Sequence, residues 1–137
     1  MNCELCITAN ETLLWSGRYC RVILVEDADY RGFCRVIWNE HIKEMTDLSA
    51  QMRSELMNTV FAVESAVREV MRPEKINLAS LGNMTPHLHW HVIPRYLDDK
   101  HFPNPVWAAP LRDTRTASSS DNIRERLSAS ILERLTA

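Results

Sequence analysis

The spacing of apolar residues changes along the chain and separates predicted strands from predicted helices. In the first third, short runs rich in β-branched and apolar residues predict strands at 12–16, 20–25 and 33–38, with a polar loop ending at Gly32 before the third run. Another strand is predicted at 75–81. We expect the second and third strands to pair in antiparallel fashion across their loop.

A helical period follows these first strands. From about Leu48 to Met71, apolar residues recur at spacings of three and four, which predicts an amphipathic helix of about six turns. Asp47 or Ser49 can cap its first turn, and Pro73 can end it.

The C-terminal part has a less regular pattern. Several prolines and polar residues at 97–122 predict an irregular segment on the surface, with Thr116–Ser120 as its most mobile part. Asp121 can cap a last helix with apolar positions at Ile123, Leu127, Ile131 and Leu135. The element order predicts an α+β fold, in which an antiparallel sheet of about five strands packs with one long helix and a C-terminal helix.

Length and composition fit one domain. The 137 residues can bury one core, so we predict a single domain over 1–137 with its core at about 3–96. A net charge of −2 without a dense basic run argues against a nucleic-acid polymer as partner. No apolar run approaches the roughly 20 residues that cross a bilayer, and the first residues do not read as a signal peptide. We therefore expect a cytoplasmic protein that does not bind membranes.

Three of the five histidines alternate with apolar residues inside 86–96. If this run is a strand, His87, His89 and His91 share one face, because successive side chains point to opposite faces. The apolar residues between them would then pack on the core. This strand is where we expect the chemistry.

Imidazoles in this arrangement allow several roles. A purely structural role is disfavoured, because three adjacent buried rings would compete for hydrogen-bond partners. They could instead ligate a metal that activates water, or one of them could act as a nucleophile. The spacing alone does not separate a metal-dependent hydrolase from a histidine nucleophile.

The stretch Gly82–Arg95, GNMTPHLHWHVIPR, resembles the histidine triad (HIT) family, whose signature is His-φ-His-φ-His-φ-φ. The upstream order of strand pair, long helix, strand and glycine loop is also similar, so the resemblance covers about 3–96. It implies a HIT-like fold and a nucleotide hydrolase or nucleotidyl transferase that cleaves at the α-phosphate of a purine nucleotide derivative. Dinucleoside polyphosphates and nucleoside phosphoramidates are the substrate types it suggests. A homodimer is also implied, and a non-catalytic nucleotide-binding module is an alternative.

The resemblance also implies roles for the three histidines. His89, the middle one, would attack phosphorus and form a covalent nucleotidyl-histidine intermediate, while His91 would orient the phosphoryl group and His87 would support the site. Many relatives have Pro-Gly-His where this chain has Arg31-Gly32-Phe33, so that additional histidine is absent here.

Substrate contacts are implied at four further positions. Asn83 falls where relatives usually have a glutamine that contacts phosphate oxygens, and Met84 follows where serine or threonine is common. Asn77 resembles an asparagine that borders the family's site. Glu26 or Asp27, after the second strand, could accept hydrogen bonds from a ribose.

Cysteines at positions 3 and 6 form a Cys-x-x-Cys motif, which by itself supplies only half of a tetrahedral zinc site. Some relatives bind structural zinc through such a pair, a histidine after the third strand and the first triad histidine. The matching residues here are Cys3, Cys6, His41 and His87, which implies a structural zinc ion and no cofactor for the chemistry itself.

The remaining candidates are expected to be structural. Cys20 and Cys34 lie in strand patterns and should be buried. His101 has no evident partner and is expected on the surface. Trp107 is the exception, because C-terminal segments in the HIT family often approach the active site.

Overall fold

The computed structural model describes residues 3–113 and 122–135. Its regular elements are β1 (Thr12–Ser16), β2 (Cys20–Leu24), β3 (Cys34–Trp38), the 3₁₀ turn η1 (Met45–Asp47), α1 (Ala50–Met71), β4 (Lys75–Ala79), β5 (His89–Arg95) and α2 (Ile123–Leu135). The predicted strands and both predicted helices are therefore present, with bounds that differ by at most three residues.

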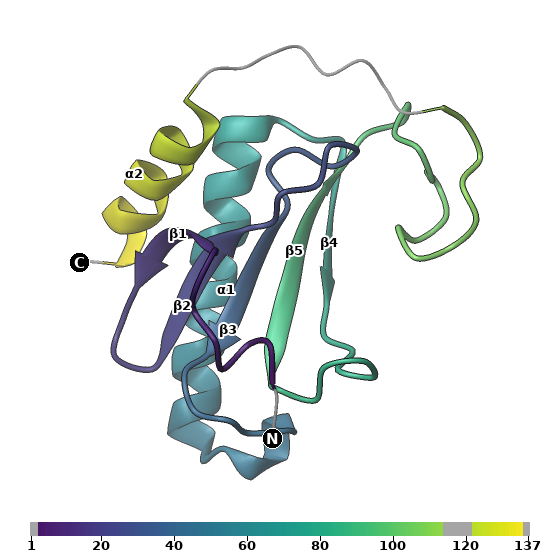
Figure 1. Ribbon diagram of the computed structural model, residues 1–137. Coiled ribbons are helices and arrows are strands. Elements are labelled where there is room, and N and C mark those ends of the chain that lie inside the picture. The colour runs from purple at the N-terminus through teal and green to yellow at the C-terminus, as the bar shows by residue number, and fades with distance from the viewer. Residues whose placement is uncertain (1–2, 114–121, 136–137) are drawn as a thin grey trace.

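The five strands form one antiparallel sheet in the order β1-β2-β3-β5-β4. Helix α1 packs on the sheet across β3 and β5, and α2 packs on α1 and β1. Both helices therefore lie on the same side of the sheet, as Figure 1 shows. The predicted α+β fold with a long helix and a C-terminal helix is confirmed.

Strand alternation assigns side chains to the two faces of the sheet. The helix-side face contributes Val22 of β2, Val36 of β3 and Val92 of β5 to the main core, and each is fully buried. Cys20 and Cys34 join the same core, as predicted. The opposite face carries the alternate residues of these strands, including the histidines of β5.

Helix α1 begins at a side-chain cap and ends at a left-handed residue. The Ser49 hydroxyl accepts a hydrogen bond from the Met52 amide at 3.2 Å, so of the two predicted caps Ser49 is the one used. Asp47 instead caps η1 through the Glu44 amide. The helix ends where Arg72 adopts a φ of 49°, immediately before Pro73.

The triad histidines do not all lie within β5, which corrects one prediction. The strand begins at His89, and His87 precedes it because the His87 amide donates to the Thr85 carbonyl in a local turn. Pairing with the end of β3 resumes at Leu88, whose carbonyl accepts from the Trp38 amide. The side chain of His87 therefore does not have to follow the alternation of β5.

Between β5 and α2 the described chain, 96–113, contains turns and no helix or strand, as expected. Helix α2 buries Ile123, Leu127 and Ile131, which confirms its predicted apolar face. The predicted mobile stretch Thr116–Ser120 and the predicted cap Asp121 lie outside the described residues. None of the helices in the described ranges is long and apolar enough to cross a membrane.

Candidate active site and metal centre

Two cysteines and two histidines from three distant parts of the chain meet at the start of the triad segment. Cys3, Cys6, His41 and His87 each offer one ligand atom, and these atoms all lie within 4.8 Å of one another. The N-terminal segment is held there because Leu5 packs with Ile23 and Ile37. The predicted metal-ligand set is thus brought together in space.

The separations within this cluster fit a tetrahedral metal. The Nδ1 atom of His87 lies 3.4 Å from the sulfur of Cys3, 3.4 Å from that of Cys6, and 3.3 Å from Nδ1 of His41. Zn–S bonds of about 2.3 Å and Zn–N bonds of about 2.0 Å would separate S and N by about 3.5 Å, and two N atoms by about 3.3 Å. Soft thiolates together with imidazoles are also the donor set that zinc prefers. The residues therefore fit a closed zinc site.

His87 is fixed from its other ring nitrogen. Its Nε2 lies 2.6 Å from the Trp38 carbonyl oxygen, which can only accept, so Nε2 carries the proton. The Nδ1 lone pair is then directed at the Cys-His cluster. Such a hydrogen bond behind a metal-binding imidazole sets its tautomer and orientation.

His89 presents the opposite nitrogen to the site. Its Nδ1 lies 2.6 Å from the carbonyl oxygen of His87, so Nδ1–H donates and Nε2 carries the free lone pair. The ring is buried, with 6% of its surface exposed, and this burial lowers the pKa of His89. The imidazole is therefore neutral near pH 7 and has an available nucleophilic nitrogen.

His91 is enclosed by aromatic rings. It contacts Phe33, His89 and Trp107 edge-on, with ring centroids 5.6, 4.9 and 5.2 Å away. Burial, helped by the neighbouring His89 and by Arg35, lowers the pKa of His91 to about 4. Its Nδ1 atom is buried and has no hydrogen-bond partner within the described part of the chain.

Comparison with known proteins adds a sequence match to this geometry. The family model of the HIT domain matches residues 8–98, which include all three triad histidines. The chain belongs to the histidine triad family.

Relatives of known structure and sequence agree with this membership. A crystal structure of a histidine triad protein from Bradyrhizobium japonicum is 27% identical, with a TM-score of 0.76 over 89% of this chain and 91% of that chain. A zinc-bound histidine triad family protein from Mycobacterium smegmatis shares the fold at 21% identity, with a TM-score of 0.65 over 91% of this chain and 86% of that chain. AP-4-A phosphorylase of Mycobacterium tuberculosis is 27% identical over an alignment of 105 residues that covers 69% of this chain and 54% of that protein. The chain thus spans about half the length of this curated relative.

A pocket of about 510 Å³ adjoins the first two triad histidines. It is lined by residues of the segment around η1, of the glycine loop after β4 and of the triad segment: Lys43, Glu44, Met45, Thr46, Ser80, Leu81, Gly82, His87, Leu88, His89 and Trp90. The glycine loop and the triad segment therefore border a space large enough for part of a small ligand.

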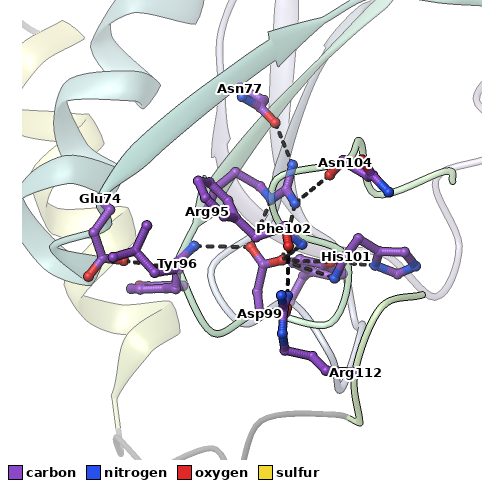
Figure 2. Close-up of polar contacts among 11 residues, drawn as sticks. Glu74, Asn77, Arg95, Tyr96, Asp99, His101, Phe102, Asn104 and Arg112 are labelled. Atoms are coloured by element: carbon purple, nitrogen blue, oxygen red, sulfur yellow. Dashed lines mark hydrogen bonds and ion pairs between the residues drawn. The ribbon is translucent and has the colours of Figure 1, made fainter. Parts of the chain in front are cut away.

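The C-terminal segment is anchored beside the histidines by a buried ion pair. Arg95, at the end of β5, donates to Asp99 from Nε at 2.8 Å, and both side chains are at most 2% exposed. Figure 2 shows Asp99 at the centre of a network that also takes amide hydrogen bonds from Tyr96, His101 and Phe102. Although burial alone would raise it, these hydrogen bonds hold the pKa of Asp99 down at about 2. The network fixes the segment that carries Trp107 to His91, as the prediction for Trp107 anticipated.

The prediction for His101 was wrong. Its ring is 9% exposed, and its Nδ1 lies 2.5 Å from the Tyr30 hydroxyl, which also donates to Asp99 at 3.3 Å. Burial and the nearby Asp99 charge raise the pKa of Tyr30 to about 12. His101 is thus part of the anchor, and sequence reasoning missed it because its partner lies 71 positions away.

The four predicted substrate-contact residues are dispersed. Asn83 is exposed in the loop before His87. Asn77 lies on the histidine face, opposite Ile93, but its side-chain oxygen accepts from Arg95 at 2.8 Å. Glu26 and Asp27 line a separate pocket of about 510 Å³.

The side chains of Glu26 and Asp27 already have local partners. Glu26 accepts from the Thr12 hydroxyl at 2.8 Å, and Asp27 accepts from the Asp29 amide at 2.9 Å. The structure thus brings the metal set together at His87, whereas Glu26 and Asp27 line a different pocket from the one that His87 and His89 border.

Proposed function

We propose that this HIT protein is a nucleotide hydrolase or nucleotidyl transferase that uses His89 as its covalent nucleophile. The observation that carries the proposal is the 2.6 Å hydrogen bond between Nδ1 of His89 and the His87 carbonyl, which leaves the Nε2 lone pair available. Family membership and the 27% identical AP-4-A phosphorylase support a reaction on nucleotides. Purine dinucleoside polyphosphates and nucleoside phosphoramidates are the proposed substrate types.

The proposed reaction has two displacement steps. The Nε2 lone pair of His89 attacks the α-phosphorus as the bond to the leaving group breaks, and the leaving group departs with the electron pair of that bond and takes up a proton. Water, or a second acceptor, then attacks the same phosphorus and gives up a proton, while the bond between phosphorus and Nε2 breaks and its electron pair returns to Nε2. His91, whose ring contacts that of His89, would orient the phosphoryl group.

We further propose that Cys3, Cys6, His41 and His87 hold a structural zinc ion. The set is closed by four protein ligands, so the metal would supply rigidity and no open coordination position. It would tie the N-terminal segment to the residue whose carbonyl orients His89. The chemistry at phosphorus then depends on the protein's own side chains.

The geometry favours this reading over a hydrolase that uses the three triad histidines as metal ligands. Both ring nitrogens of His87 are engaged, one by the Trp38 carbonyl and one by the Cys-His cluster. The Nδ1 of His89 is engaged by a carbonyl as well. The three rings therefore do not present a common set of free nitrogens. The homodimer implied by the family stays a prediction.

Covalent trapping tests the proposed reaction. The protein is incubated with radiolabelled adenylyl and guanylyl substrates, quenched in alkali and digested, and an acid-labile adduct is expected on His89. His89→Asn should give no adduct, whereas His101→Gln, outside the catalytic set, should still give one. Absence of an adduct across these substrates, together with bound but unconverted nucleotide, would identify a binding module instead. Chelator-sensitive turnover that persists in His89→Asn would favour the metal-dependent hydrolase.

A further inference from the structure

Arg35 occupies an unusual position on the histidine face of the sheet. Its neighbours on β3, Cys34 and Val36, are fully buried in the helix-side core, so alternation turns Arg35 to the opposite face. In the register between β3 and β5, Arg35 is the direct partner of His91. Directly opposed residues on a sheet face have Cβ atoms about 4.5–5.5 Å apart. The side chain of Arg35, which carries a permanent positive charge, therefore begins beside the third triad histidine.

Both members of this pair have a buried polar atom that the described protein leaves unsatisfied. These atoms are Nε of Arg35 and Nδ1 of His91. None of the ion pairs found among the described residues involves Arg35. A buried polar atom without a hydrogen-bond partner is unfavourable, so these two atoms on directly paired residues of neighbouring strands require an explanation.

The other arginines of this face have partners of their own. Arg21 is paired with Glu11 at 3.0 Å, and its other bond, to the Leu5 carbonyl, supports the N-terminal segment. Arg95 is paired with Asp99 at 2.8 Å. Arg35 differs from both because its charge is not neutralised by a carboxylate of the described chain. The positive charge of Arg35 also helps to lower the pKa of His91, as expected for a charge close to that ring.

We propose that Arg35 is a phosphate-binding residue of this site, which donates to a non-bridging oxygen of the phosphoryl group attacked by His89, beside His91. A guanidinium remains protonated at any working pH and matches the geometry of phosphate oxygens. An anionic ligand at this position would satisfy the unpaired Nε atom of Arg35. The inference rests on the proposed function and specifies its ligand: a nucleotide recognised through the charge of its α-phosphate.

Arg35 lies on the sheet and not in the loop before His87, so it would reach the phosphate from a different direction. Asn83 is exposed, and the side chain of Met84 is 95% exposed and cannot donate a hydrogen bond. Arg35 would supply positive charge from β3, on the histidine face of the sheet, and not from that loop. The sequence signal was a single arginine within the apolar run of β3, and its meaning appears only once β5 is known to lie beside it.

Equilibrium binding of nucleotides and nucleosides tests the proposal without turnover. Affinities for AMP and adenosine, and for GMP and guanosine, are measured by calorimetry in wild type, Arg35→Met, Arg35→Gln and Arg35→Lys. We expect Arg35→Met and Arg35→Gln to lose about 30–100-fold in nucleotide affinity while nucleoside affinity stays within about 2-fold. Arg35→Lys, which keeps the charge without the fork, should recover only part of the loss. Arg18→Met removes an equal charge from the β1–β2 turn and should leave all affinities unchanged.

The outcomes separate this inference from the proposed reaction. Equal nucleotide preference in Arg35→Met and wild type, or no preference for nucleotide over nucleoside in wild type, would overturn the role of Arg35. Loss of nucleoside affinity in parallel would indicate a packing role and would overturn it as well. Missing covalent adduct in wild type, with the nucleotide preference still dependent on Arg35, would contradict the His89 chemistry alone. Circular dichroism of each variant verifies the fold, and Arg35→Lys and Arg35→Gln decide the question if Arg35→Met unfolds.

Discussion

Nδ1 of His89 lies 2.6 Å from the carbonyl oxygen of His87, so the main chain of one triad histidine orients the ring of the next. The side chain of His87 points elsewhere, to the Cys-His cluster through Nδ1 and to the Trp38 carbonyl through Nε2. One residue therefore links the metal centre to the proposed nucleophile through two different groups.

This relationship predicts different stabilities for two variants of His89. Asparagine can still donate to the His87 carbonyl from a position close to that of Nδ1, so His89→Asn should unfold within about 2 °C of wild type. His89→Leu leaves the buried carbonyl without a donor and should lose roughly 1–3 kcal/mol of unfolding free energy. Thermal and urea unfolding measure both, and equal stability of the two variants would show that the hydrogen bond contributes little.

Removing one thiol should remove the metal. Cys3→Ser takes one ligand from the closed set, so zinc content should fall from about one equivalent per chain to well below that value, and the melting temperature should fall with it. Cys20→Ala changes a core cysteine outside the cluster and should keep its zinc. Elemental analysis after purification without chelators decides the matter. Metal-free wild-type protein would rule out the proposed zinc site.

The ion pair between Arg95 and Asp99 should contribute far more to stability than the one between Arg134 and Glu69. The first pair is at most 2% exposed, whereas the side chains of the second are 30% and 56% exposed. Asp99→Asn leaves an uncompensated buried charge and should cost about 3–5 kcal/mol, whereas Glu69→Gln breaks an exposed ion pair and should change the stability little. Urea unfolding compares the two, and similar losses would contradict the anchoring role of Asp99.

Protonation of His91 should destabilise the fold in mild acid. In the unfolded chain its pKa is about 6.5, whereas burial lowers the folded-state pKa to about 4. The unfolded state therefore binds more protons between these values, so the stability present above pH 6.5 is lost as the pH falls toward 4. Asp99, with a folded-state pKa of about 2, acts in a lower pH range.

The variant His91→Phe isolates this effect, because phenylalanine keeps an aromatic ring and cannot take up a proton. Between pH 7.5 and 4.5, the free energy of unfolding of wild type should fall by about 2–3 kcal/mol more than that of the variant. Urea titrations at several pH values measure the difference. Parallel pH profiles for the two proteins would show that His91 titrates normally.

Local patterns were sufficient to predict the elements and part of the site. The spacing of apolar residues predicted α1, and the alternation of histidines with apolar residues predicted β5. The turn that places His87 before this strand was not predicted. The metal set was found because the family resemblance joined the Cys-x-x-Cys motif to His41 and His87. These predictions depend on short-range periodicity or on a motif whose members keep their spacing.

The parts that sequence reasoning missed depend on contacts between distant residues. The role proposed for Arg35 depends on β3 lying beside β5 in the sheet. The sequence does not indicate this pairing, because α1 and β4 separate the two strands along the chain. His101 was expected on the surface because its partner Tyr30 lies in the β2–β3 loop. The sequence of segment 96–113 has no periodic pattern from which its path could be predicted. The ion pair between Asp99 and Arg95 was therefore found only in the structure.

The two faces of the sheet are covered in different ways. On one side, α1 and α2 bury a continuous apolar core. On the other side, two segments flank the histidines. Cys3 and Cys6 attach the N-terminal segment to His41 and His87, and Asp99 attaches the C-terminal segment to Arg95. None of Cys3, Cys6 and Asp99 belongs to that core. Apart from Cys3, Cys6 and Asp99, which hold these two segments in place, their residues can therefore be exchanged to alter the surroundings of the histidines while the apolar core stays as it is.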